Sequence, residues 1–158
     1  IHLIDLIIWL IGKKPITVST FGNNIATNKT VFKRNSLMVY IFKFPGNIIA
    51  KVTANAAGYY NHFHELKVFF KNKTIINTPG EKVIYSKKNE KKLTIKKLKG
   101  SYPDKINRKK IIRNFIDQIY NKKIKPIISV KEQLDLMTVC FEADKSLKKG
   151  KKIKIKYL

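Results

Sequence analysis

The first twelve positions of the chain are almost entirely apolar and read IHLIDLIIWLIG. A run of this length predicts a helix, and a helix that is apolar on nearly every side is expected to be buried against other elements. Gly12 can adopt the left-handed backbone that ends a helix, and Pro15 cannot continue the turn. We therefore expect one buried helix over residues 1–12.

Short β-rich runs follow one another through the middle of the chain. They occupy residues 16–22, 36–44, 47–56, 63–70, 73–77, 81–86 and 92–98. Pro45 and Gly46 join the second and third runs and give a strong hairpin signal. Successive strands separated by short turns favour an antiparallel sheet, because parallel pairs need long crossover connections. Several runs are apolar on both faces, so the face that helices leave open needs another cover.

Two later segments have the period of helices. Asp104 is a candidate cap for a helix over about residues 105–121, in which apolar side chains recur on one face. Ser129 and Glu132 form a capping-box pair that opens a second helix, and a short strand follows from Ile153. The predicted fold class is α+β, with a mostly antiparallel open sheet and the helices packed on one face. At 158 residues, the chain is expected to form a single domain.

The formal charge of +24 raises the possibility of nucleic-acid binding, because clustered cations release counterions from phosphates. The excess is nearly all lysine, spread over turns, strand faces and the tail, and the arginines are Arg34, Arg108 and Arg113. A lysine coat of this kind is mostly a solvated surface, so nucleic acid is the less favoured partner.

Cys140 is the lone cysteine, which fits a reducing cytoplasm and excludes an intramolecular disulfide. The apolar opening is too short to span a bilayer, so no membrane association is expected.

His2 and Asp5 are three residues apart, which places both side chains on one helix face. An imidazole can give or take a proton near neutral pH, so His2 is a candidate general acid or base. The structural alternative is a capping or core histidine that Asp5 satisfies through a hydrogen bond. His62 and His64 are a second histidine pair, but no third ligand stands at a useful spacing, so no metal site is predicted.

Basic residues crowd the predicted start of the first late helix, where the helix dipole disfavours cations. A bound anion would reverse that effect, and an arginine fork suits phosphate or carboxylate. Asn107 and Arg108 are therefore candidate substrate contacts, and the alternative is a solvated lysine-rich turn. Tyr60 is a candidate for lining a sugar site, although an aromatic residue there is as often part of the core.

Several of these features together resemble the C-terminal domain of the Gfo/Idh/MocA oxidoreductases. The resemblance is carried by His2-x-x-Asp5 followed by Trp9, Gly12 and Pro15, by residues 61–75, and by residues 114–158. Phe70 and Lys73 depart from it, since glycines are common there.

The resemblance implies an NAD(P)-dependent oxidoreductase that transfers hydride between nicotinamide and a sugar, cyclitol or nucleotide sugar. It implies that His2 is the catalytic acid/base and that Asp5, Tyr60, Asn107 and Arg108 contact the substrate. NAD or NADP would be bound mainly by a preceding dinucleotide-binding domain, because residues 1–158 contain no G-x-G-x-x-G fingerprint. A homodimer or homotetramer through the open sheet face is implied as well. Two alternatives stay open: a basic nucleic-acid-binding module, and a family member that has lost catalysis.

Overall fold

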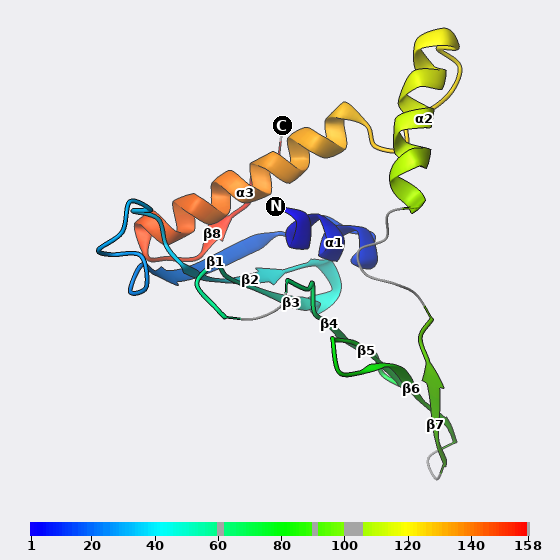
Figure 1. Cartoon of the computed structure of the whole chain (residues 1–158), viewed down its shortest axis with the longest axis horizontal. Coiled ribbons are helices and arrows are strands. Elements are labelled where there is room, and N and C mark those ends of the chain that lie inside the picture. Colours follow the sequence, from blue (N-terminus) through cyan, green and yellow to red (C-terminus); the bar gives the residue numbers. More distant parts are fainter. Residues whose placement is uncertain (60–61, 90–91, 100–105, 158) are drawn as a thin grey trace. The chain divides into compact units, whose positions relative to one another are not determined.

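The computed structural model describes residues 1–59, 62–89, 92–99 and 106–157, and the chain divides into two units (Figure 1). The first unit consists of Ile1–Tyr59 and Ile128–Leu158, and the second of Tyr60–Ile127. Each unit has its own four-stranded antiparallel sheet.

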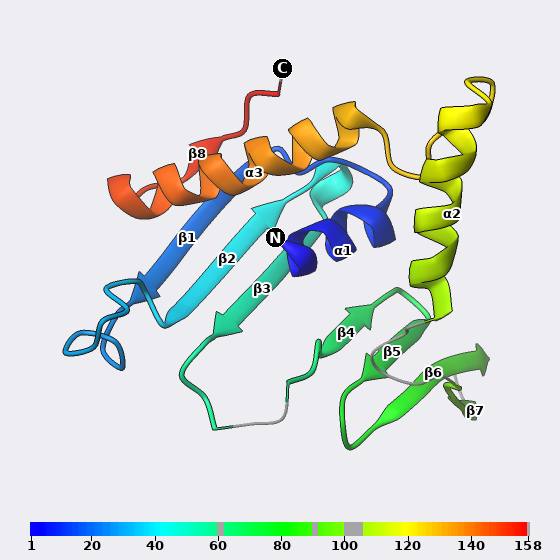
Figure 2. The ribbon, with the colours of Figure 1, turned by 45° about the horizontal axis from the view of Figure 1, so that its top comes forward.

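The first unit combines a sheet of order β3-β2-β1-β8 with two helices. Its elements are α1 (His2–Ile11), β1 (Thr17–Asn23), β2 (Leu37–Lys43), the 3₁₀ turn η1 (Pro45–Asn47), β3 (Ile49–Asn55), α3 (Val130–Lys149) and β8 (Ile153–Lys154). Figure 2 shows α1 and α3 across one face of this sheet. The expected hairpin through Pro45 and Gly46 is confirmed, because β2 and β3 pair on either side of it.

The core of the first unit lies between that sheet face and the helices. Alternate residues of each strand point toward the helices, which buries Val18, Phe42 and Val52. They pack with a buried stripe of α3 that includes Val139 and with Ile4 of α1. The residues of opposite parity lie on the uncovered face, where Phe21 is 59%, Ile41 40% and Ile49 70% exposed.

The helix ends follow the sequence signals. Gly12 and Gly150 end α1 and α3 with φ of 67° and 58°, in the left-handed region that glycine adopts without strain. At the start of α3, the Ser129 hydroxyl accepts a hydrogen bond from the Glu132 amide, and the Glu132 carboxylate accepts one from the Ser129 amide. The predicted capping box is therefore confirmed.

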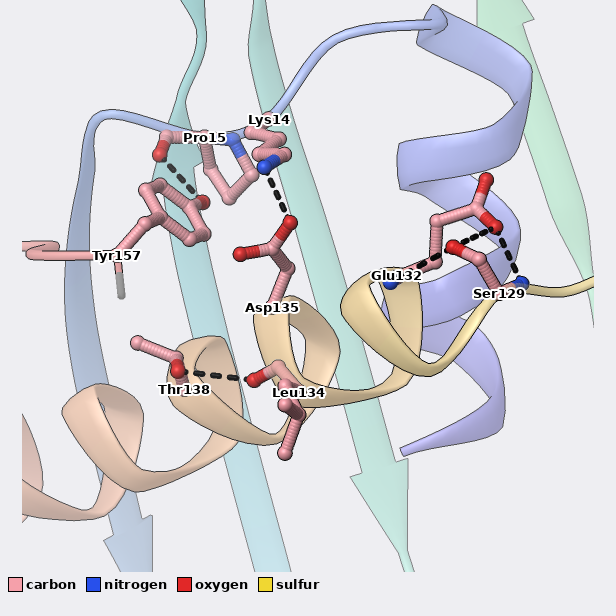
Figure 3. Close-up of polar contacts among 8 residues, drawn as sticks. All are labelled: Lys14, Pro15, Ser129, Glu132, Leu134, Asp135, Thr138 and Tyr157. Carbon is pink, nitrogen blue, oxygen red and sulfur yellow. Dashed lines mark hydrogen bonds and ion pairs between the residues drawn. The ribbon is translucent and has the colours of Figure 1, made fainter.

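A polar cluster fastens the α1–β1 connection to α3 and to the last residues of the chain (Figure 3). Lys14 forms an ion pair with Asp135, whose carboxylate is nearly buried. The Lys14 ammonium also lies 4.9 Å from the centre of the Tyr157 ring, and the Tyr157 hydroxyl donates to the Pro15 carbonyl at 2.8 Å. These contacts hold together segments at opposite ends of the sequence.

The second unit contains a sheet of order β4-β5-β6-β7 and one helix. Its elements are β4 (Leu66–Phe69), β5 (Lys73–Asn77), β6 (Lys82–Asn89), β7 (Lys92–Lys97) and α2 (Ile106–Tyr120). Asn114 anchors the segment after α2, because its side chain donates to the Lys125 carbonyl and accepts from the Ile127 amide.

The α+β class and the antiparallel pairing are as predicted, and so is the position of α1 and α3 on one face of the first sheet (Figure 2). The strands form two sheets where one was expected, because β4 to β7 pair only with one another. The expected burial of α1 is wrong for the described chain. Ile4 is its buried residue and Trp9 is 75% exposed, since only one side of the helix contacts the core.

The helix α2 was expected to pack on the sheet face with the other helices, yet members of its apolar stripe, which include Phe115 and Ile119, are exposed. The candidate cap Asp104 lies outside the described residues. Within the described ranges, no helix combines the length and apolar character needed to cross a membrane.

Candidate functional site

His2 and Asp5 occupy the first turn of α1, and both side chains are exposed. The helix begins at Ile1, whose carbonyl accepts the Asp5 amide at 3.0 Å. Among the described residues, neither the His2 ring nor the Asp5 carboxylate has a hydrogen-bond or ion-pair partner. The structural alternative, a buried histidine held by Asp5, is therefore not what the structure shows, and both groups are available to a ligand.

Trp9 extends the same face of α1. Spacings of three and seven residues place Asp5 and Trp9 on the side of the helix that carries His2. With 75% of its surface exposed, Trp9 offers an apolar ring beside two polar groups. In the sequence, Trp9 contributes to the family resemblance, and its seven-residue spacing from His2 is the signal that places it on this face.

Asp5 also has a favourable electrostatic position. A carboxylate in the first turn is stabilised by the positive end of the helix dipole. Since a carboxylate only accepts hydrogen bonds when ionised, Asp5 can receive a substrate hydroxyl or an imidazole N–H. The first turn of α1 thus offers one group able to move a proton and one able to hold a hydroxyl.

Asn107 and Arg108 lie in the first turn of α2, in the second unit, and both are exposed. That turn contains no acidic residue, and within the described ranges Arg108 forms no ion pair. This helix start therefore stays a predicted anion site. Tyr60 lies outside the described residues.

His62 and His64 precede β4 and do not belong to it, which differs from the expected strand placement. Their ring centres are 5.1 Å apart. In the part of the chain that the structure describes, no three histidine, cysteine or acidic side chains come together as metal ligands would.

The residues of this chain do not by themselves fit a dinucleotide. The pyrophosphate of such cofactors needs free backbone amides at a glycine-rich helix start. At the start of α3 the Glu132 carboxylate and the Ser129 hydroxyl already fill that position. Residues 1–158 contain no G-x-G-x-x-G sequence.

Comparisons with known proteins give matches among solved structures, whereas no family model and no curated sequence matches. Myo-inositol 2-dehydrogenase from Lactobacillus plantarum has 18% identity and a TM-score of 0.72, over 98% of this chain and 46% of that one. UDP-N-acetylglucosamine 3-dehydrogenase from Acidithiobacillus ferrooxidans has 12% identity and a TM-score of 0.72, over 94% and 45%. The WlbA dehydrogenase from Bordetella pertussis, solved with NADH and UDP-GlcNAcA, has 15% identity and a TM-score of 0.69, over 99% and 45%.

These structural neighbours are oxidoreductases of the Gfo/Idh/MocA type, as the sequence resemblance predicted. At such low identities the match establishes the fold, which is that of the C-terminal part of these dehydrogenases. The chain spans about half the length of the solved structures that it matches.

Proposed function

We propose that this chain is the substrate-binding and proton-transferring part of an NAD(P)-dependent oxidoreductase that acts on a sugar, cyclitol or nucleotide sugar. One observation carries the proposal: an exposed histidine, which has no partner among the residues that the structure describes, stands one helical turn from a carboxylate. The fold is shared with dehydrogenases of such substrates. The cofactor, NAD or NADP, is assigned mainly to a dinucleotide-binding domain outside residues 1–158.

In the oxidising direction, a substrate hydroxyl becomes a carbonyl and must lose its proton. His2 accepts that proton on a ring nitrogen, and in the reducing direction it returns the proton to the carbonyl oxygen. Asp5 holds the ring or a neighbouring hydroxyl through a hydrogen bond. The hydride chemistry belongs to the nicotinamide, which lies outside what these residues supply.

The remaining substrate contacts are assigned to Tyr60, Asn107 and Arg108. Support for Arg108 comes from its exposure in the first turn of α2, which is basic and contains no acidic residue and so suits the diphosphate of a nucleotide sugar. The uncovered face of the first sheet, which carries Phe21, Ile41 and Ile49, is assigned to contact between subunits of a homodimer or homotetramer. Cytoplasmic residence is proposed from the single cysteine, Cys140.

A substrate survey with the full-length protein tests this function. Myo-inositol, free hexoses and UDP-linked hexosamines are each incubated with NAD⁺ or NADP⁺, and nicotinamide reduction is followed by absorbance. We expect at least one polyol to reduce one of the two cofactors. If no polyol reacts with either cofactor, while the same preparation is folded and binds a nicotinamide cofactor, the proposed activity is wrong.

A further inference from the structure

Trp9 is a large apolar residue on the solvent side of α1, and 75% of its surface is exposed. The buried residue of this helix is Ile4, which is five positions earlier and therefore about 140° away around the helix axis. Within the described ranges, no aromatic ring stacks on Trp9 and no cation lies over its ring. Because an indole gains much from leaving water, the packing of the first unit gives no reason for a tryptophan at this position.

The exposed indole shares its helix face with the two groups assigned to proton transfer and hydroxyl binding. Asp5 is four residues before Trp9 and His2 is seven, which places them about 6 and 10 Å away along the helix axis. Long side chains of a helix lean toward its N-terminus, so the indole is directed over the turn that contains Asp5. The face therefore carries, in order, a group that can exchange a proton, a hydrogen-bond acceptor and an aromatic surface.

These three groups suit different parts of a single ring that carries several hydroxyls. The rim of such a ring is polar, and its hydroxyls can donate to the Asp5 carboxylate. Its faces consist of C–H groups, which are apolar and whose hydrogens match the negative face of an indole. An open-chain polyol has no fixed C–H face and must lose conformational freedom to form one, so it is expected to stack less well.

We propose that Trp9 is a specificity-determining residue that stacks on the C–H face of the substrate's ring and favours cyclic polyols over open-chain polyols. The inference rests on the proposed function, because it takes His2 and Asp5 as the other groups that contact the substrate. It deepens that function by naming the closed ring as the feature that this helix face selects.

Trp9 can report on this contact itself, because it is the only tryptophan of residues 1–158. In the full-length protein, with any other tryptophan replaced by phenylalanine, its emission is followed without cofactor so that no turnover occurs. Myo-inositol and N-acetylglucosamine are the ring probes, and glucitol, which has as many hydroxyls as myo-inositol, is the open-chain control. We expect a ring probe to shift the emission to shorter wavelength and to slow quenching by acrylamide. Glucitol should need a concentration at least about tenfold higher for the same effect.

Variants separate the stacking contact from other roles of the side chain. Trp9→Ala should raise the KM for a cyclic polyol about three- to tenfold, which is the effect of losing an aromatic contact. The kcat should stay near the parent value, because the ring touches the indole equally in the ground state and the transition state. Trp9→Phe keeps an aromatic face and should recover most of the loss. Leu10→Ala is the control, since it removes another exposed apolar side chain of α1, about 100° around the helix from Trp9, and should leave KM unchanged.

The outcomes distinguish this inference from the proposed function. If neither ring probe changes the emission or the quenching at any concentration up to its solubility, or if the indole is already shielded from acrylamide before a probe is added, the stacking contact is wrong. If the enzyme turns over a cyclic polyol but Trp9→Ala keeps the parent KM, the contact is also wrong while the function stands. Protection of Trp9 by a ring probe and not by glucitol, without turnover of any polyol, supports the contact and removes the function.

Discussion

Asp135 is a buried carboxylate, 6% exposed, whose cationic partner Lys14 stands 121 positions earlier in the chain. A buried charge that loses its partner is costly, because neither water nor a counter-charge compensates it. The Lys14 side chain is 45% exposed, so solvent screens part of the interaction. This pair, and the Tyr157 ring over which the Lys14 ammonium lies, hold the connection between α1 and β1 against α3 and the last residues of the chain.

Lys14→Met should therefore lower the free energy of unfolding by about 1 to 3 kcal/mol, because Asp135 keeps its burial and loses its cation. Lys13→Met is the matched control, since Lys13 is exposed and should change stability by no more than about 0.5 kcal/mol. Urea unfolding followed by circular dichroism measures both. Equal midpoints for the two variants would show that the Lys14–Asp135 pair contributes nothing.

For single residues, the sequence predicts contacts between side chains that are close together along the chain. The Ser129–Glu132 box spans three residues, and its chemistry is readable from residue types alone. The exposure of His2 and Asp5 and the partner of Lys14 could not be read, because they depend on which distant segments pack against α1.

Among the elements, α3 begins with a capping box whose contribution to the stability of the fold depends on pH. The hydrogen bonds from the Ser129 amide and hydroxyl lower the pKa of Glu132 below its ordinary value of 4.5. A lowered carboxyl pKa in the folded state means that the extra stability is fully present above pH 4.5. It disappears as the pH falls through the lowered value.

Glu132→Gln should therefore melt at a lower temperature than the parent at pH 7, and the difference should shrink at pH values below 4.5. Thermal unfolding at a series of pH values measures this. In a Ser129→Ala background, which lacks the hydroxyl hydrogen bond, the same Glu132→Gln change should have a smaller effect at pH 7. A difference that stays constant from pH 7 to pH 3 would contradict the linkage.

The apolar run over residues 1–12 predicted α1, and helical period with capping signals predicted α2 and α3, but none of these signals predicted what covers each helix. The stripe of α2 has helical spacing, yet Phe115 is 65% and Ile119 62% exposed. Periodicity identifies an apolar face, whereas the identity of its partner depends on segments far away in sequence or on another surface. The same limit explains why α1 was expected to be buried on all sides.

For the whole molecule, strands that are apolar on both faces predicted an apolar sheet face that the helices leave open, and the first sheet has such a face. The local hairpins were readable from their turns, whereas the β1–β8 pair, which places Ile153 opposite Val18, joins distant segments and was not. The division into two sheets was also not readable, because the turn signals within and between the sheets are alike.

A Phe21→Glu variant should convert the proposed homodimer or homotetramer into monomers, because it places a charge on the uncovered face where the subunits are proposed to meet. A stable interface there would bury more than roughly 1,000 Å². Val31→Glu is the control, since Val31 is 89% exposed and lies outside the strands. Light scattering gives the mass of each, and a parent protein that is already monomeric at micromolar concentration would refute the subunit contact.

Turnover by a His2→Asn variant of the full-length protein tests the assigned proton transfer most directly. A positioned base contributes about 10² to 10⁴ in rate, so kcat should fall at least about 100-fold. KM should change little because a general base acts mainly in the transition state, and the melting temperature should be kept because the His2 side chain is exposed. A variant that keeps kcat within about threefold of the parent would remove His2 from the mechanism.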